Sequence, residues 1–365
     1  MALSLAERER RYRLIRGEMA QRDLDVLLVT GSDGSNRRGN HRYLAGYGVV
    51  APFDHYVVFP REEVEPVFFS SGSRSALTPK AQGWVNDLRL EHKPQMLVLE
   101  EVRRFKRDGG IGLVEINTVP IPMYVDLVGD FGNGAVRDAT EIFKKARLIK
   151  SEEEIACIRR AAKVADDIYV HLKSIVRPGL TDWEIWGEIK RLETAAQVDY
   201  AMDLIECAEK NSVYLPVGNA LPAGGRADVE ITPAYEGYYA QLRGFAPVAP
   251  YTVKERNLLD AWQHGYEAAI ESMRPGSRAC DVYWAAFNAI RATGYEAPGR
   301  GGHSIGLDVD EFLSCDRWDE TPIEAGMVIV CHIAAEAKDV YRALLGGTFL
   351  ITRDGAEALN KVDLI

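Results

Sequence analysis

The sequence has no apolar run that reaches the roughly 18 residues of a membrane-spanning helix. Its N-terminal segment, residues 1–23, is charged and helical in pattern, without the apolar core of a signal peptide. We therefore expect a cytoplasmic protein. No C-x-x-C pair occurs, and the cysteines are scattered and odd in number, which predicts neither a disulfide framework nor a zinc knuckle. Buried free thiols are the simpler interpretation for the five, which are Cys157, Cys207, Cys280, Cys315 and Cys331.

Basic residues are outnumbered. The chain has 44 Lys and Arg against 54 Asp and Glu, a net charge of -10 at pH 7. Nucleic acids and anionic membranes select for clustered Lys and Arg, so this balance argues against both as main partners. Small molecules are the expected ligands.

The length of 365 residues predicts two domains, because a single core rarely grows so large. Residues 1–146 alternate helix and strand signals, starting with a buried-strand pattern at Leu24 to Thr30, and this predicts an α/β domain with a central sheet. Ser151 and Glu154 then have the spacing of a capping box, which predicts the start of a long helix that Pro178 ends. We place the second domain at residues 147–365.

The second domain contains an internal repeat. An Arg-Pro-Gly turn follows one helix at residues 177–179 and another at residues 274–276, and each turn leads into a further helix and then a strand-rich segment. Shared flanking helices favour a duplication over chance. We predict two α+β halves related by a pseudo-twofold axis, with a ligand cleft between their sheets.

Several motifs, in this order and spacing, resemble one known family. They are R-L-I-K-S-E-E-E-I, the paired R-P-G turns, G-Y-Y-A-Q-L-R, G-H-S-I-G-L-D-V-D and G-M-V-I-V-C-H. The set resembles the pita-bread family of creatinase, prolidase and the Xaa-Pro and methionine aminopeptidases, over nearly the whole chain. The resemblance implies a pita-bread second domain and a creatinase- or prolidase-like first domain. It also implies a homodimer in which residues around Phe53 and His55 reach the partner's pocket.

The resemblance also implies five metal-ligand positions, which the peptidase members fill with two Asp, one His and two Glu. In this sequence the positions fall, in order, at Glu230, Gln241, His303, His332 and near Gly346. A carboxamide is a poor bridging ligand and glycine is none, so we expect no two-ion centre and no cofactor.

In motif, the chain is closest to the metal-free branch of creatinase and ectoine hydrolase. Tyr214 falls where creatinase has its catalytic His, and Arg243 falls where creatinase has an acid, so creatine itself is not the expected substrate. If residues 239–243 form one strand, Tyr239, Gln241 and Arg243 share a face of the pocket. A planar guanidinium suits a substrate carboxylate, but Arg243 could equally neutralise Glu230, and both interpretations stay open.

These residues predict a metal-independent hydrolase of a non-peptide C–N bond in a small, anionic molecule. His303 is the expected general base, because an imidazole titrates near neutrality. His332 or Tyr214 would protonate the leaving group. Glu230 would orient an imidazole, and Gln241 would hydrogen-bond the substrate.

Other chemistries remain open at this point. Lyase chemistry by proton abstraction could use the same residues. Glu230, His303 and His332 could instead hold one zinc or iron ion in a peptidase-like hydrolase or lyase. The third alternative is a ligand-binding protein without catalysis.

Overall fold

The computed structural model describes all residues except 1–2, 32–37, 49–52, 73–83, 208–212 and 339. The chain divides into two compact units, Met1–Arg147 and Leu148–Ile365, one residue away from the predicted boundary. Within the described residues, no helix combines the length and apolar character needed to cross a membrane.

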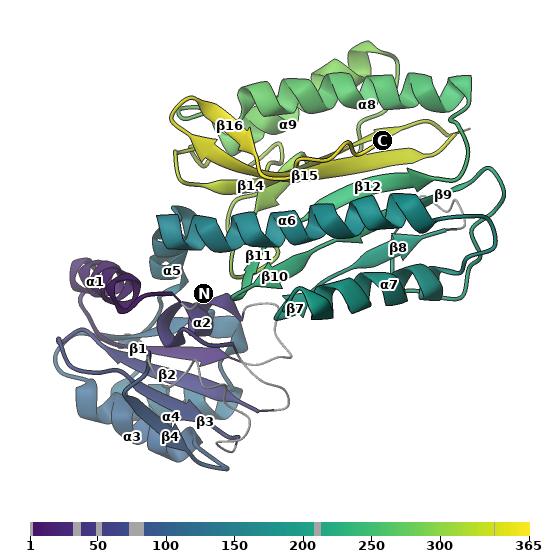
Figure 1. Cartoon of the computed structure of the whole chain (residues 1–365). Helices are drawn as coiled ribbons and strands as arrows, with labels where there is room; N and C mark the ends of the chain where they lie inside the picture. Colours follow the sequence, from purple (N-terminus) through teal and green to yellow (C-terminus); the bar gives the residue numbers. More distant parts are fainter. Residues whose placement is uncertain (1–2, 32–37, 49–52, 73–83, 208–212, 339) are drawn as a thin grey trace. The chain divides into compact units, whose positions relative to one another are not determined.

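The N-terminal unit is built around a six-stranded sheet (Figure 1). Its strands are β1 (Leu24–Gly31), β2 (His55–Pro60), β3 (Val67–Ser70), β4 (Asp87–Leu90), β5 (Gly110–Val114) and β6 (Val136–Asp138), in the order β4-β3-β2-β1-β5-β6. Its helices are α1 (Leu5–Gln21), α2 (Gly39–Ala45), α3 (Gln95–Phe105), α4 (Ile121–Phe131) and α5 (Thr140–Leu148), with a short 3-10 helix at Ile116–Thr118. The central strand β1 is buried along its whole length, which accounts for its continuous apolar pattern.

Two buried histidines, His41 on α2 and His55 on β2, pack together in this unit. The ring centroids of His41 and His55 are 5.2 Å apart, and Tyr47 lies edge-on to His41 at 5.3 Å. Neither ring nitrogen of His41 has a hydrogen-bond partner among the described residues. Burial lowers the pKa of His41 well below its usual value, and the nearby His55 and Arg42 lower it further.

We expect the stability of the protein to fall as the pH falls below about 6.5, partly because of His41. The unfolded chain takes up a proton on this side chain near pH 6.5, whereas the folded chain does so only at much lower pH. Each such histidine makes the free energy of unfolding fall by up to about 1.4 kcal/mol for each unit by which the pH falls. Denaturant unfolding of His41→Phe between pH 5 and 7.5 should show a shallower slope than the wild type. His92→Phe, at an exposed site, is the control and should leave the slope unchanged; equal slopes for His41→Phe and the wild type would contradict the prediction.

The C-terminal unit contains four long helices and a large antiparallel sheet (Figure 1). The helices are α6 (Glu152–Ile175), α7 (Asp182–Ala195), α8 (Val253–Ser272) and α9 (Ala279–Ala292). The large sheet contains β8 (Leu204–Glu206), β9 (Arg226–Ile231), β12 (Leu242–Pro247), β13 (Gly302–Ser304), β14 (Val328–Glu336), β15 (Arg342–Thr352) and β16 (Gly355–Ala358). A small separate sheet contains β7 (Tyr200–Ala201), β10 (Pro233–Tyr235) and β11 (Tyr238–Tyr239).

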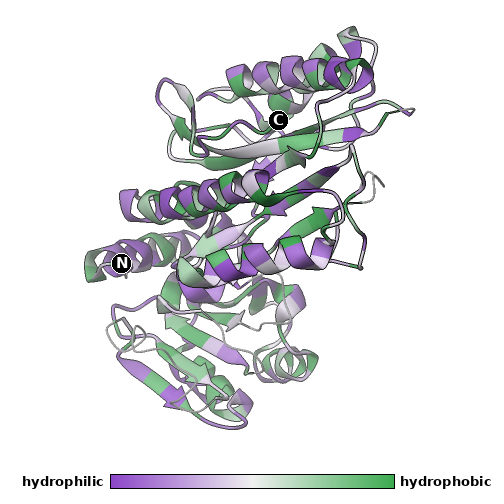
Figure 2. Cartoon of the chain, turned by 45° about the vertical axis from the view of Figure 1, so that its right-hand side comes forward, coloured by the Kyte–Doolittle hydropathy of each residue, from purple (hydrophilic) through white to green (hydrophobic). Residues whose placement is uncertain are grey.

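Sequence signals explain where these helices begin. The predicted capping box at Ser151 and Glu154 is present at the start of α6, and Thr181 and Thr252 cap α7 and α8 in the same way. Hydrophilic and hydrophobic residues alternate along the helices, as expected when one face covers a sheet (Figure 2).

The two helix pairs are followed by strands that join into one continuous sheet. Its order is β13-β14-β15-β12-β9-β8, with β16 beside β15. The halves meet where β12 pairs with β15, at Arg243 and Gly346. The prediction of two separate sheets is therefore wrong, because hydrogen bonding continues across the junction.

Candidate functional site

Four strands of the large sheet place a row of candidate residues side by side. His332 on β14 pairs with Gly346 on β15, Gly346 pairs with Arg243 on β12, and Arg243 pairs with Glu230 on β9. Residues directly opposite each other in an antiparallel sheet point to the same face. Side chains from distant parts of the sequence thus meet on one face of the junction.

Arg243 occupies the centre of this row in an ion cluster. Its Nε and Nη2 donate to the two carboxylate oxygens of Asp228 at 3.2 and 3.0 Å, and its Nη1 donates to Glu230 Oε2 at 3.4 Å. Only 5% of Arg243 is exposed. Of the two roles open for Arg243 in the sequence, the structure contains the ion pair with Glu230. It also contains a forked pair to Asp228 that no sequence pattern indicates.

Glu230 is bound from two sides. Gln241 Nε2 donates to Glu230 Oε1 at 2.7 Å, while Arg243 contacts the other oxygen. Burial raises the pKa of the Glu230 carboxyl, and the charge of Arg243 opposes that rise. Gln241 Oε1 is buried and accepts no hydrogen bond within the described part of the chain, so Gln241 presents an unused acceptor.

His303 lies on β13, in contact with the row. Gly302 before it has φ +152°, and a Cβ there would lie 2.0 Å from the Val330 carbonyl oxygen, so only glycine lets β13 approach β14 this closely. The Nδ1 of His303 lies 3.1 Å from the Ser304 carbonyl oxygen. A carbonyl only accepts, so Nδ1 carries the proton and Nε2 keeps its lone pair in the neutral ring. Burial lowers the pKa of His303, and Asp310 opposes this shift.

His332 faces His303, with ring centroids 4.9 Å apart and planes at 77°. Both ring nitrogens of His332 are buried without a hydrogen-bond partner in the described structure. Burial lowers the pKa of His332 well below its usual value. His303 and the guanidinium groups of Arg300, Arg243 and Arg342 lower it further. His332 is therefore neutral at pH 7 and lies in a positive electrostatic field.

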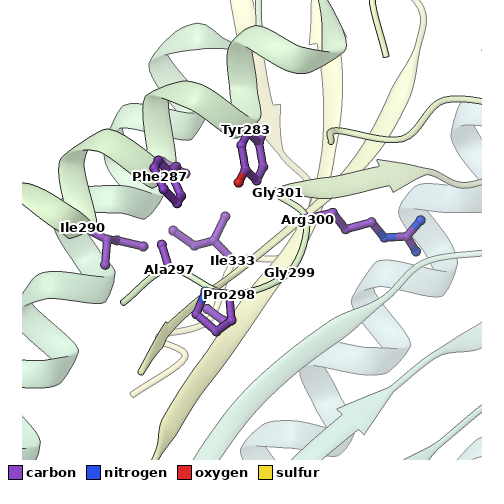
Figure 3. Close-up of a pocket in the computed structure, with 11 residues that line it drawn as sticks. Tyr283, Phe287, Ile290, Ala297, Pro298, Gly299, Arg300, Gly301 and Ile333 are labelled. Atoms are coloured by element: carbon purple, nitrogen blue, oxygen red, sulfur yellow. The ribbon is translucent and has the colours of Figure 1, made fainter. Parts of the chain in front are cut away.

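Arg300 and Asp310 form an ion pair of 2.5 Å beside His303, and Asp310 lies 4.0 Å from His303 Nδ1. Figure 3 shows Arg300 extending away from a small apolar cavity that Tyr283, Phe287 and neighbouring residues line. This cavity has a volume of about 10 Å³, which is room for about one water molecule and too little for a substrate.

Other predicted site residues lie elsewhere. Tyr239 belongs to the small sheet, so the predicted strand through residues 239–243 is wrong, because the backbone leaves β11 before β12 begins. Tyr214 pairs with Ile205 at the far edge and accepts from Asn219 Nδ2 at 3.4 Å. His55 is buried on β2 of the N-terminal unit, where its ring packs against His41.

Phe53 precedes β2 in the N-terminal unit, and its ring lies against Gly72. The role given to Phe53 and His55 in a partner's pocket stays a prediction.

Comparison with known proteins identifies the family. The model of metallopeptidase family M24 matches residues 156–353. The chain belongs to this family. It is 26% identical over 239 residues to an Xaa-Pro dipeptidase of Pyrococcus horikoshii, a match covering 61% of this chain and 65% of that protein. It is 24% identical over 381 residues to an uncharacterized hydrolase/peptidase, y4tL, of Sinorhizobium fredii, covering 98% of this chain and 95% of the relative.

The solved structures show the same fold. The prolidase of Pyrococcus horikoshii OT3 superposes with a TM-score of 0.80 at 19% identity, over 98% of this chain and 100% of that one. The predicted pita-bread fold is confirmed.

Membership in M24 corrects the predicted activity. A metal-independent hydrolase of a non-peptide C–N bond is wrong, because the family is one of metallopeptidases and the Pyrococcus proteins are named as an Xaa-Pro dipeptidase and a prolidase. The peptidase-like alternative fits these relatives better. Altered ligand positions bear on which ions a pocket can hold, and they do not indicate which bond it cleaves.

The side chains present do not fit the metal centre that the family name implies. A Cβ at Gly346 would lie 1.9 Å from the Cys331 carbonyl oxygen, so no ligand side chain can occupy that position on this backbone. Glu230, His303 and His332 are the three residues that could hold a single ion. Both carboxylate oxygens of Glu230 already accept hydrogen bonds. Among the described residues, no group of three or more His, Cys, Asp or Glu side chains is arranged to hold a metal ion.

Proposed function

We propose that this protein hydrolyses the peptide bond of short peptides at the His303–His332 pair, with Xaa-Pro dipeptides as the first substrate class to test. The observation that carries the proposal is the contact between the two imidazoles, whose ring centroids are 4.9 Å apart. In the neutral His303 ring Nε2 keeps its lone pair, and neither ring nitrogen of His332 has a hydrogen-bond partner among the described residues. The Xaa-Pro dipeptidase relative supports the choice of bond. Closeness to the creatinase branch stays a prediction from the motifs.

In this proposal the two histidines have different tasks, and assigning those tasks does not make the enzyme metal-independent. His303 Nε2 takes a proton from the attacking water, whose oxygen bonds to the peptide carbon. The same imidazole then gives that proton to the departing amine as the C–N bond breaks. Asp310, 4.0 Å from Nδ1, stabilises the cation that His303 becomes between these steps.

His332 stays neutral and donates its unpaired N–H to the carbonyl oxygen as negative charge develops there. The positive field of Arg243, Arg300 and Arg342 at His332 favours that charge. Gln241 Oε1, the unused buried acceptor, receives an N–H of the bound peptide. This differs from the role of leaving-group acid that the sequence suggested for His332, because a histidine with so low a pKa is seldom protonated at pH 7.

Substitution of either histidine is expected to abolish most of the activity. His303→Ala should lower kcat by about 10²- to 10⁴-fold through loss of the base, and His332→Ala by about 10²- to 10³-fold through loss of the oxyanion donor. Because burial lowers the pKa of His303, the acid limb of the wild-type rate should lie below pH 6.5. The measurement is release of free proline from a panel of Xaa-Pro dipeptides, with matched dipeptides lacking proline.

The control variant is His171→Ala, at a half-exposed histidine that pairs with Glu188 on α7. It should retain wild-type rates. Each assay is run after chelation and after addition of zinc, manganese, cobalt or iron. Proline release that never exceeds the His303→Ala background, under any of these conditions, would overturn the proposal.

A second candidate function is peptide binding without turnover. The observation in its favour concerns Arg243, whose guanidinium group binds both Asp228 and Glu230. Neither carboxylate is then left for catalysis. Calorimetric titration with the same dipeptides distinguishes the two: binding without proline release in any condition supports the second candidate.

A further inference from the structure

A cavity of about 300 Å³ is lined by residues of α8, β15 and the segment 358–365. This volume is at the lower end of the range for small-molecule sites, about 300–1,000 Å³. It shares no lining residue with the row at the sheet junction. The inference drawn from it does not depend on the proposed peptidase activity.

One wall of the cavity is aromatic. Trp262 and Tyr266 on α8 stack with centroids 4.7 Å apart and planes at 23°, and Phe349 on β15 lies edge-on to Tyr266 at 6.0 Å. Trp262 is only 3% exposed and anchors the stack. Rings presented in this way bind flat apolar groups and attract cations through their electron-rich faces.

The charged side chains that line the cavity have one sign. Glu267 on α8 and Asp363 are exposed acids in its lining, and no Lys or Arg is among the described residues that line it. Lys173 lies outside the lining, where its Nζ donates to the main-chain oxygens of Asp363 and Ile365 at 3.4 and 2.9 Å. The floor is polar and buried, with Thr348 and Asn360 already hydrogen-bonded to each other.

We propose that this cavity binds a small organic cation with an aromatic body, such as an arylalkyl amine. The aromatic body packs against Tyr266, the partly exposed member of the stack, and the ammonium group lies beside the exposed Glu267 and Asp363. An anionic analogue is repelled by the same two carboxylates, and a neutral one gains the packing alone.

The floor links this cavity to the candidate site. Thr348 Oγ1 accepts a hydrogen bond from the main-chain N–H of Gln241 at 2.8 Å and donates one to the main-chain carbonyl oxygen of Gln241 at 2.9 Å. A ligand resting on Thr348 therefore lies one residue away from the side chain that holds Glu230.

The test uses three probes of similar shape and different charge on the full chain: tyramine, 4-ethylphenol and 3-(4-hydroxyphenyl)propionate. Binding is measured by isothermal titration calorimetry and by quenching of tryptophan fluorescence at pH 7. Tyramine should bind about tenfold more tightly than 4-ethylphenol, and the propionate should bind most weakly. The double variant Glu267→Gln/Asp363→Asn should remove most of the preference for tyramine and leave binding of 4-ethylphenol unchanged.

Two further variants keep the test decisive. Glu271→Gln, one turn further along α8 and outside the lining, should bind all probes like the wild type. Ala358→Phe, which fills the cavity from β16, should block all three probes, with its fold checked by circular dichroism. Equal affinity for tyramine and the propionate, an unchanged preference in the double variant, or undiminished binding to folded Ala358→Phe would each overturn the proposal.

Discussion

Replacing Arg243 by methionine is expected to lower the free energy of unfolding by about 3–5 kcal/mol at pH 7. The guanidinium is the shared partner of two buried carboxylates, at 3.0 Å from Asp228 and 3.4 Å from Glu230. Methionine keeps much of the volume and removes the charge, so both carboxylates remain buried without their cation. Denaturant unfolding, followed by circular dichroism, measures the loss.

The controls separate burial of charge from loss of a contact. Adding Asp228→Asn and Glu230→Gln to Arg243→Met removes the unpaired charges and should recover much of the stability. Arg159→Met breaks an exposed forked pair with Glu357, at 2.7 Å, and should cost under about 1 kcal/mol. A similarly small cost for Arg243→Met would show that Asp228 and Glu230 are not held by this cation in the folded protein.

Local patterns in the sequence were sufficient for much of the fold. The capping box at Ser151 and Glu154 predicts the start of α6, and the observed helix Glu152–Ile175 ends before Pro178 as expected. Such signals act over a few residues, because they satisfy backbone groups at one helix end or bury one stripe of side chains. The family resemblance then supplied the pita-bread fold, which propensity alone does not define.

The site was harder to predict, because it depends on pairing between strands far apart in the chain. Alternation predicts that Gln241 and Arg243 point the same way, and both do contact Glu230. It fails for Tyr239, because a change of sheet between β11 and β12 resets the alternation. Asp228 was missed for a related reason. It falls at no family ligand position, and only the register of β9 against β12 brings it to Arg243.

The positive electrostatic field at His332 likewise arises only when the folded chain brings distant residues together. Its sources are Arg243, Arg300 and Arg342, which come from three separate segments. Of these, only Arg243 has a sequence signal, through its spacing from Gln241. Burial first, and then the nearby cations, lower the pKa of a histidine that the sequence presents as an acid catalyst and hold it neutral.

Gly346 is the position where restoring the family's carboxylate is expected to fail. A Cβ there would lie 1.9 Å from the Cys331 carbonyl oxygen and 2.6 Å from His332 Cα, and both are backbone atoms of the paired strand. Relief requires β14 and β15 to separate, so Gly346→Ala should lower the free energy of unfolding by more than about 3 kcal/mol, and Gly346→Glu by at least as much. Denaturant unfolding measures the first effect, and metal content after dialysis against zinc or manganese tests whether Gly346→Glu gains an ion.

The matched control is Gly187→Ala, inside helix α7 of the same unit, where a Cβ meets no atom within 4 Å. It should raise the free energy of unfolding by about 0.5–1 kcal/mol, because alanine loses less backbone entropy in a helix. The two substitutions add the same methyl group and should have opposite signs. If Gly346→Ala were as stable as the wild type, β14 and β15 would not approach as closely as their register indicates. The position could then accept a ligand side chain, and the argument against a metal centre at this junction would lose its steric basis.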